Sequence, residues 1–102
     1  MISNDIQKLL PKIRECLSSQ PVEKAWLFGS CSRGEEKADS DIDLLVRYKR
    51  DSNFSLMTIA KIIVTLENAI NKSVDLIEEG RILPFARKSA NHDKILIYER
   101  ES

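Results

Sequence analysis

A glycine-serine pair and three aspartates are the residues of this 102-residue sequence whose types and spacing could do chemistry. Gly29 and Ser30 follow a short apolar run, and a helix that starts there would offer unpaired N–H groups to an anion such as phosphate. Arg33, three residues further on, adds a positively charged fork. We therefore predict a phosphate-binding turn. The alternative is an ordinary strand-to-helix turn, in which Ser30 is the N-cap and Arg33 pairs with an acid.

Asp41 and Asp43 carry a second chemical signal, at the head of the next apolar run. Because side chains alternate along a strand, we expect both carboxylates on the same face. Two like charges at that distance repel unless protons or a divalent cation neutralise them. Mg²⁺ is favoured, since it takes oxygen ligands and is commonly shared with substrate phosphates. The alternative is that one aspartate caps a turn and the other is solvated.

Asp75 is the one charged residue between Val74 and Ile77. A carboxylate buried in such a run is costly unless a cation accompanies it, so a partner cation is expected. An edge position that faces water is the alternative. Three carboxylates on two strands beside a phosphate turn form the set that metal-assisted nucleotidyl transfer requires.

Hydrophobic patterning indicates the elements that must position these residues. Runs of Val, Ile and Leu predict strands, and apolar side chains at steps of three and four predict helices. The expected strands cover 25–28, 42–48, 73–78 and 94–98, and the expected helices cover 2–17, a short segment after 29, 54–71 and 84–90. Pro11 leaves open whether the first helix kinks there or a second one starts there. So many positions of 54–71 are apolar that we expect a deeply packed helix.

This order of elements describes an α/β (α+β) layer, in which helices pack on a small mixed sheet of about four strands. The long helical connection between the second and third strands is compatible with a parallel pair, but strand order cannot be deduced from one sequence. We expect one domain over 1–102 and no separate substrate-recognition domain, because a compact core takes about 100 to 150 residues.

Composition limits the classes of function. Hydrophobic residues make up 42% and charged residues 31% of the chain, which is typical of globular proteins. The 16 Lys and Arg balance the 16 Asp and Glu, so no general field favours nucleic-acid binding. No apolar run reaches the roughly 20 residues that cross a bilayer, and we see no basic, apolar leader, so we expect a cytoplasmic protein without membrane contact. Two cysteines without metal-like spacing argue against a disulfide framework.

The candidate residues form a string that resembles a known family. The string is Gly-Ser, ten further residues and Asp-x-Asp, with Arg-Gly at 33–34 and Val-Asp-Leu at 74–76. It resembles the minimal nucleotidyltransferase family of the DNA polymerase beta superfold, over nearly the whole chain. One departure is Ser32, where alanine is common, and serine is small enough to leave the loop intact.

The resemblance implies the polymerase beta-like nucleotidyltransferase fold and a role for each matching residue. The implied roles are phosphate binding by Gly29, Ser30 and Arg33, metal binding by Asp41 and Asp43, and metal binding or deprotonation of the attacking hydroxyl by Asp75.

Members of the family that are this short resemble the antitoxin halves of bacterial toxin–antitoxin pairs. The resemblance then implies an enzyme that uses Mg²⁺ or Mn²⁺ to transfer AMP from ATP to a tyrosine of an all-helical, HEPN-type toxin, with release of pyrophosphate. Two alternatives stay open, namely a non-catalytic module that blocks its partner and nucleotidyl transfer to a small molecule. The sequence does not fix the acceptor, the preferred base or the oligomeric state.

Other conspicuous side chains are assigned no chemistry. Trp26 and Phe28 are expected in the core because they lie in a wholly apolar run. His92 is expected to be solvated or a cap, and the basic pair at 87–88 is expected on a solvated face. Cys31 is expected in the ligand-facing loop, but no histidine pattern activates it for covalent catalysis.

Overall fold

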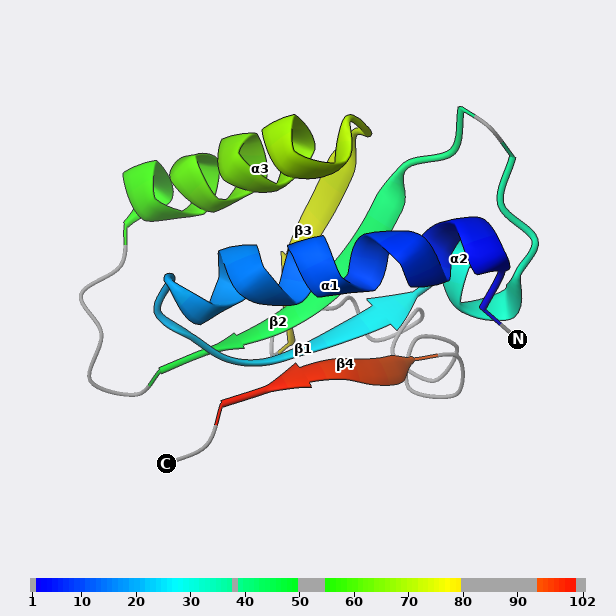
Figure 1. Ribbon diagram of the computed structural model, residues 1–102. Helices are drawn as coiled ribbons and strands as arrows, with labels where there is room; N and C mark the ends of the chain where they lie inside the picture. Colours follow the sequence, from blue (N-terminus) through cyan, green and yellow to red (C-terminus); the bar gives the residue numbers. More distant parts are fainter. Residues whose placement is uncertain (1, 38, 50–54, 80–93, 101–102) are drawn as a thin grey trace.

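The computed structural model describes residues 2–37, 39–49, 55–79 and 94–100 (Figure 1). Its elements are α1 (Asn4–Ser18), β1 (Val22–Phe28), α2 (Ser30–Arg33), β2 (Ile42–Tyr48), α3 (Leu56–Ile70), β3 (Val74–Glu78) and β4 (Ile95–Glu99). None of the helices in these ranges is long and apolar enough to cross a membrane. The helix predicted at 84–90, the basic pair at 87–88 and His92 lie outside the described residues.

The four strands form one mixed sheet in the order β3-β2-β1-β4. β1 pairs antiparallel with β2 and with β4, whereas β2 and β3 are parallel, with α3 as the crossover between them. The prediction of a small mixed sheet with packed helices is confirmed. β1 begins at Val22, three residues before the predicted start. The prediction started at Ala25 because it relied on a run of apolar residues, and the polar residues Glu23 and Lys24 interrupt that run.

α1 is one continuous helix, which settles the question raised by Pro11. Its N-cap is Ser3, whose hydroxyl accepts a hydrogen bond from the Ile6 N–H at 3.3 Å. Pro11 lies on the exposed side of the helix. Proline has no N–H to donate to the Gln7 carbonyl, but on this side water can donate to that carbonyl instead. The opposite side packs on the sheet through Ile6, Leu10, Ile13 and Leu17.

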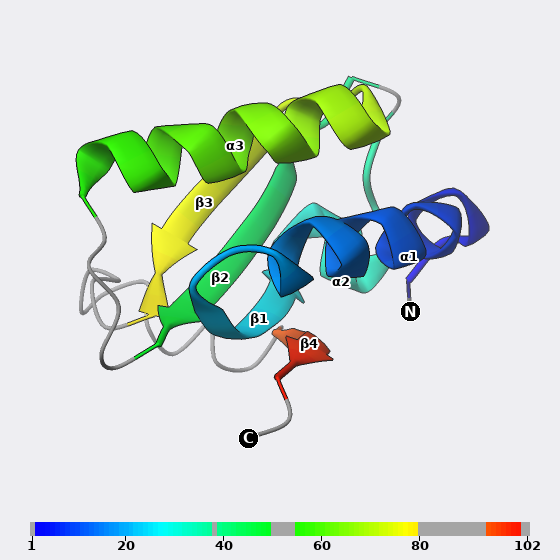
Figure 2. The ribbon, with the colours of Figure 1, turned by 60° about the vertical axis from the view of Figure 1, so that its left-hand side comes forward.

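α1 and α3 lie side by side on one face of the sheet (Figures 1 and 2). α3 buries only Ile62, Leu66 and Ile70, while Met57 is 79% and Val64 54% exposed. The expectation that this helix is deeply packed is therefore wrong. A helix on the outside of two layers meets the sheet with a single face, and apolar spacing alone does not say whether the other face is covered.

The sheet buries apolar side chains on both faces. The larger cluster lies between the sheet and the two long helices, and the smaller one, on the other face, contains Trp26 and Leu45 with Phe28 and Ile77 packed against them. Trp26 is 8% exposed, and its ring lies under the Arg47 guanidinium, with 5.4 Å between the centroid and Cζ. The prediction that Trp26 belongs to the core is confirmed.

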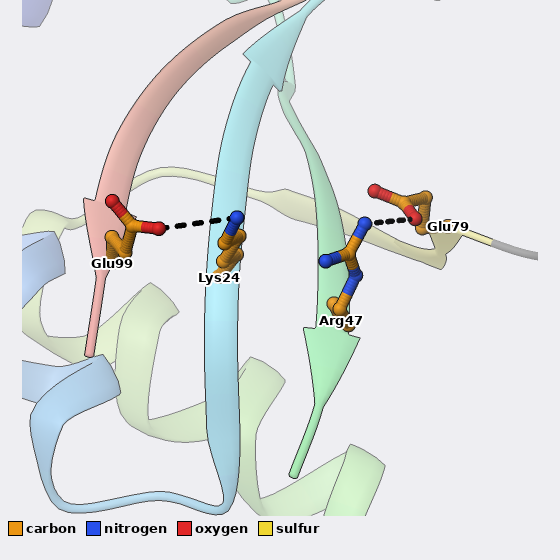
Figure 3. A network of polar contacts seen from close by, with 4 residues as sticks. All are labelled: Lys24, Arg47, Glu79 and Glu99. Atoms are coloured by element: carbon orange, nitrogen blue, oxygen red, sulfur yellow. Dashed lines mark hydrogen bonds and ion pairs between the residues drawn. The ribbon is translucent and has the colours of Figure 1, made fainter. Parts of the chain in front are cut away.

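Two ion pairs lie at one end of the sheet, one between β1 and β4 and the other between β2 and the residue that follows β3 (Figure 3). Lys24 Nζ lies 3.1 Å from Glu99 Oε2, and Arg47 Nη2 lies 2.8 Å from Glu79 Oε1. Because all four side chains are partly exposed, each pair contributes about 0–1 kcal/mol. Their contribution to the stability of the fold is therefore small.

Reciprocal arginine contacts connect α1 with β4. Arg14 Nε donates to the Ile97 carbonyl at 2.7 Å. Arg100, directly after β4, donates to four carbonyls that follow one another around the end of α1, at distances of 2.8 to 3.4 Å: those of Leu17, Ser18, Gln20 and Val22. α1 has no basic residue in its last turn, so Arg100 supplies both the missing donors and the positive charge that a helix C-terminus favours.

We predict that Arg100→Ala lowers the free energy of unfolding by about 2 kcal/mol, because charged hydrogen bonds of this kind contribute about 1.5–3 kcal/mol and partly buried carbonyls lose their donors. Arg100→Lys should recover only part of the loss, since one ammonium cannot reach four carbonyls. Urea denaturation measures both. Lys8→Ala, on the exposed side of α1, is the control and should change stability by less than about 0.5 kcal/mol. Equal stability of the Arg100 and Lys8 variants would contradict the assignment.

Candidate active site

Three strand ends meet at the end of the sheet opposite the ion pairs. β1 ends at Phe28, which lies opposite Asp43 of β2 in the register, and Asp43 lies opposite Asp75 of β3. Side chains in register project to the same face, and the flanking Ile42 and Leu44 belong to the core under the helices. Asp43 and Asp75 therefore lie next to each other on the face that α1 and α3 leave uncovered.

Gly29 connects this group to α2 and is in direct contact with Asp43. Its φ of 72° and ψ of −154° lie in a region that side-chain-bearing residues avoid. A Cβ added at Gly29 would lie 2.6 Å from Asp43 Oδ2, which is closer than such atoms can approach. Glycine is needed here both for the turn and for the approach of the carboxylate. The sequence indicated the turn but not the contact.

The predicted short helix after Gly29 is present as α2. Gly29 is its N-cap and Ser30 its first residue, so the alternative in which Ser30 caps the helix is wrong. Arg33 is exposed and pairs with Glu35 at 3.2 Å between Nε and Oε2. Its predicted contact with phosphate stays a prediction.

Cys31 lies in α2, directly after the predicted phosphate turn, and its side chain is fully buried. Its thiol donates a weak hydrogen bond to the Asp41 carbonyl, with 3.5 Å between Sγ and oxygen. Burial raises the pKa of the Cys31 thiol, and the negative charges of Glu36 and Asp43 raise it further. The thiol is therefore a structural contact between α2 and the head of β2, not a nucleophile.

The three aspartates differ in exposure. Asp43 is half-buried, whereas Asp41, just before β2, and Asp75, on the edge strand β3, are exposed. The expectation that Asp75 is buried is wrong, because β3 is an edge strand of the sheet that the described residues form, and the alternative of an edge position that faces water is observed. Burial raises the pKa of Asp43 above its ordinary value, and the charges of Asp75 and then Asp41 raise it further. The charges of Asp75 and Asp41 thus act electrostatically on Asp43.

The fit of a metal ion can be judged from this donor set. Among the residues that the structure describes, no three His, Cys, Asp or Glu side chains form a ready-made metal-binding group. Mg²⁺, however, usually takes one or two carboxylates and completes its shell with substrate phosphates and water. The charges of Asp75 and Asp41 raise the pKa of Asp43, which indicates that positive charge is lacking around this carboxylate. The chemistry of the site fits a Mg²⁺ ion that is shared with a phosphate-bearing substrate.

The raised pKa of Asp43 predicts a pH dependence of stability. Below its unfolded-state pKa, near 3.8, Asp43 is protonated in both states and costs nothing. As the pH rises from that value through the raised folded-state pKa, Asp43 loses its proton more readily in the unfolded state than in the folded state. The free energy of unfolding therefore falls over this range. Without metal, the difference in melting temperature between Asp43→Asn and wild type should therefore be zero or positive at neutral pH and shrink towards pH 3.8.

Thermal melts in EDTA between about pH 4 and 7 measure this difference. Asp43→Asn should also lose the stabilisation that Mg²⁺ with ATP gives the wild type by mass action. If Asp43→Asn instead melts well below wild type in EDTA, by the equivalent of about 1 kcal/mol, Asp43 holds a turn together as a cap does.

A cavity of about 430 Å³ lies elsewhere, between the first turn of α3 and the far ends of β2 and β3. Tyr48, Ile59, Leu76 and Glu78 line it. Tyr48 is five residues along β2 from Asp43, roughly 17 Å away. This cavity is therefore not the second pocket beside the phosphate turn that a small-molecule acceptor would favour.

Comparison with known proteins shows the family to which this chain belongs. Residues 11–102 match the model of the family described as "Polymerase beta, Nucleotidyltransferase", and the chain belongs to this family. Two similar proteins of Methanocaldococcus jannaschii carry the names "Putative protein adenylyltransferase MJ1379" and "Putative protein adenylyltransferase MJ1217". Each is 32% identical to this chain over 96 residues, which are 92% of this chain and 96% of the relative.

Solved structures share the fold. One described as a "putative minimal nucleotidyltransferase" superposes with a TM-score of 0.76 at 25% identity, covering 93% of this chain and 95% of that one. A complex of a tri-AMPylated HEPN toxin of Shewanella oneidensis with its MNT antitoxin superposes with a TM-score of 0.68 at 19% identity, covering 92% and 72%. A toxin–antitoxin complex with AMP-PNP gives 0.65 at 21% identity, covering 96% and 73%. The fold predicted from the sequence is confirmed.

Proposed function

We propose that this protein is a metal-dependent nucleotidyltransferase that transfers AMP from ATP to a hydroxyl of a partner protein, a tyrosine of a helical HEPN-type toxin. The contact between Gly29 and Asp43 carries the proposal, because it brings the predicted phosphate turn against the acidic group. We use this name for Asp41, Asp43 and Asp75. The names of the two archaeal relatives support protein adenylylation. The shared fold of the toxin–antitoxin complexes is compatible with the partner.

Each residue has a task in this reaction. Gly29, Ser30 and Arg33 hold the triphosphate, and the ion pair between Arg33 and Glu35 is exposed and therefore weak. Asp41 and Asp43 would hold Mg²⁺ or Mn²⁺, which supplies positive charge beside the phosphate oxygens.

The transfer itself exchanges one bond to phosphorus for another. The acceptor oxygen forms a bond to the α-phosphorus, and the bond from that phosphorus to the bridging oxygen of pyrophosphate breaks. The exposed Asp75 takes the hydroxyl proton, since it lies beside Asp43 and open to an approaching acceptor. AMP is then joined to the tyrosine, and pyrophosphate leaves.

A non-catalytic blocking module explains the site less well. Such a module has no use for neighbouring aspartates that raise the pKa of Asp43, because the repulsion opposes folding without serving the interface. Transfer to a small molecule gains no support from the cavity at Tyr48, because this cavity lies at the other end of the sheet from the phosphate turn.

The test is to co-purify the chain with the protein encoded by the neighbouring gene and to measure the intact mass of that neighbour. Incubation with ATP and Mg²⁺ should add one or more AMP units, and EDTA should prevent the gain. A neighbour that forms a stable complex but gains no mass would support the blocking module. A mass gain that persists in EDTA would contradict the metal requirement.

A further inference from the structure

Ser32 is the one buried polar residue among those that the structure describes, with 3% of its surface exposed. Its hydroxyl donates to the Gly29 carbonyl at 2.8 Å, and its backbone N–H donates to the same carbonyl at 3.1 Å. The Gly29 carbonyl therefore accepts two hydrogen bonds from a single residue. An alanine at this position would keep only the backbone bond.

The second bond matters because of the geometry of the peptide unit. The Gly29 carbonyl and the Ser30 N–H belong to one planar trans unit and point in opposite directions, so a bond that holds the carbonyl also sets the direction of the N–H. Gly29 has a backbone that glycine alone adopts readily, and glycine is the residue most free to leave any one conformation. The hydrogen bond from Ser32 therefore restrains the Gly29–Ser30 peptide at a glycine, the residue type whose backbone is the most flexible.

The surrounding contacts carry this restraint to the acidic group. Ser30 accepts a hydrogen bond from the Glu35 N–H at 2.9 Å, and Cys31 Sγ lies 3.5 Å from the Asp41 carbonyl, so α2 is attached on its far side as well. Asp43 lies directly against Gly29. The direction of the Gly29–Ser30 peptide is thus fixed relative to the carboxylates.

We propose that Ser32 is a positioning residue, whose hydroxyl holds the Gly29–Ser30 peptide in the direction that binds the terminal phosphates of a nucleoside triphosphate. The inference rests on the proposed function and deepens it, because it assigns affinity for triphosphate over monophosphate to a side chain that does not touch the nucleotide. Ser32 acts only through the Gly29 carbonyl.

Calorimetric titration of the full chain with ATP and with AMP, both with Mg²⁺, tests the proposal. Ser32→Ala should weaken ATP binding about two- to tenfold, the worth of one hydrogen bond, and should leave AMP binding unchanged. Ser19→Ala is the matched control, because the Ser19 hydroxyl also donates to the carbonyl three residues before it, that of Cys16 at 3.0 Å, but far from the site. It should change neither affinity.

Two results would overturn the inference while the proposed function stands. One is wild-type affinity of Ser32→Ala for ATP, and the other is an equal loss for ATP and AMP, which a general disturbance of the fold would produce. No binding of ATP by the wild-type chain would instead count against the proposed function.

A measurement without nucleotide separates these cases further. In the NMR spectrum of the free protein, the Gly29 and Ser30 amide signals should broaden in Ser32→Ala, because the peptide gains a second orientation on the microsecond to millisecond timescale. They should stay sharp in Ser19→Ala. Unchanged Gly29 and Ser30 signals in Ser32→Ala would show that the hydroxyl does not hold this peptide.

Discussion

Asp43→Asn is expected to abolish AMP transfer, with a loss of at least about a hundredfold to a thousandfold in rate. Asparagine has nearly the shape of aspartate, so the contact with Gly29 is kept while the charge is lost. Asp43 is the middle residue of the acidic group, raised in pKa by burial and by both other aspartates, and it is therefore the side chain that most needs a cation. Asp41→Asn should have the same effect.

The measurement is the rate of mass gain of the partner at saturating ATP and Mg²⁺. Asp39→Asn is the control, since Asp39 is an exposed acid of the same loop outside the acidic group, and its rate should stay within about twofold of wild type. Both site variants should still bind the partner. Modification that survives either of them means that the metal pair is misassigned, and a partner neutralised equally well by both favours the blocking module.

Gly29→Ala should reduce stability and activity together. The backbone of Gly29 costs about 1–3 kcal/mol for a residue with a side chain, and the new Cβ would lie 2.6 Å from Asp43 Oδ2. Either the turn or the carboxylate must move, and both are parts of the site. Urea denaturation gives the loss of stability, and the mass assay gives the loss of rate.

Two further variants separate the causes of the Gly29→Ala effect. In an Asp43→Ala background the steric part of the loss should disappear, so the two substitutions should cost less together than the sum of their separate effects. Gly34→Ala is the control, because Gly34 has a left-handed backbone at φ 74° and ψ 21° that costs about 1 kcal/mol but lies at the other end of α2. A Gly29→Ala protein as stable and as active as Gly34→Ala would rule out the contact as a determinant.

Much of the fold could be predicted because local patterning and the final structure agree. The strand predicted at 42–48 has those bounds, and the strands predicted at 73–78 and 94–98 are displaced by no more than one residue at either end. These strands are apolar runs between polar residues, a signal that is local. The order of the strands depends on pairing between distant segments, which no local pattern records.

In the candidate site, too, features that depend on the local sequence could be predicted, whereas features that depend on contacts between distant segments could not. Spacing predicted the turn at Gly29 and placed Asp43 and Asp75 on strands, and the structure brings these residues together. The sequence leaves open whether Asp75 is buried or lies at a water-facing edge, because the edge position of β3 depends on the order of the strands. The sequence likewise does not record whether another layer covers α3. The expectation of a deeply packed helix therefore misses the exposure of Met57 and Val64.

The reciprocal arginine contacts have a consequence for the native-state fluctuations of the chain. Edge strands and helix ends are ordinarily the first parts of a domain to open. Here β4 cannot leave β1 without withdrawing Arg100 from the end of α1, and α1 cannot fray without releasing the Ile97 carbonyl from Arg14. We therefore expect the first helix and the last strand, whose contacts span 78 to 83 residues of sequence, to open as one cooperative unit, and we expect their amides to share a single level of hydrogen-exchange protection.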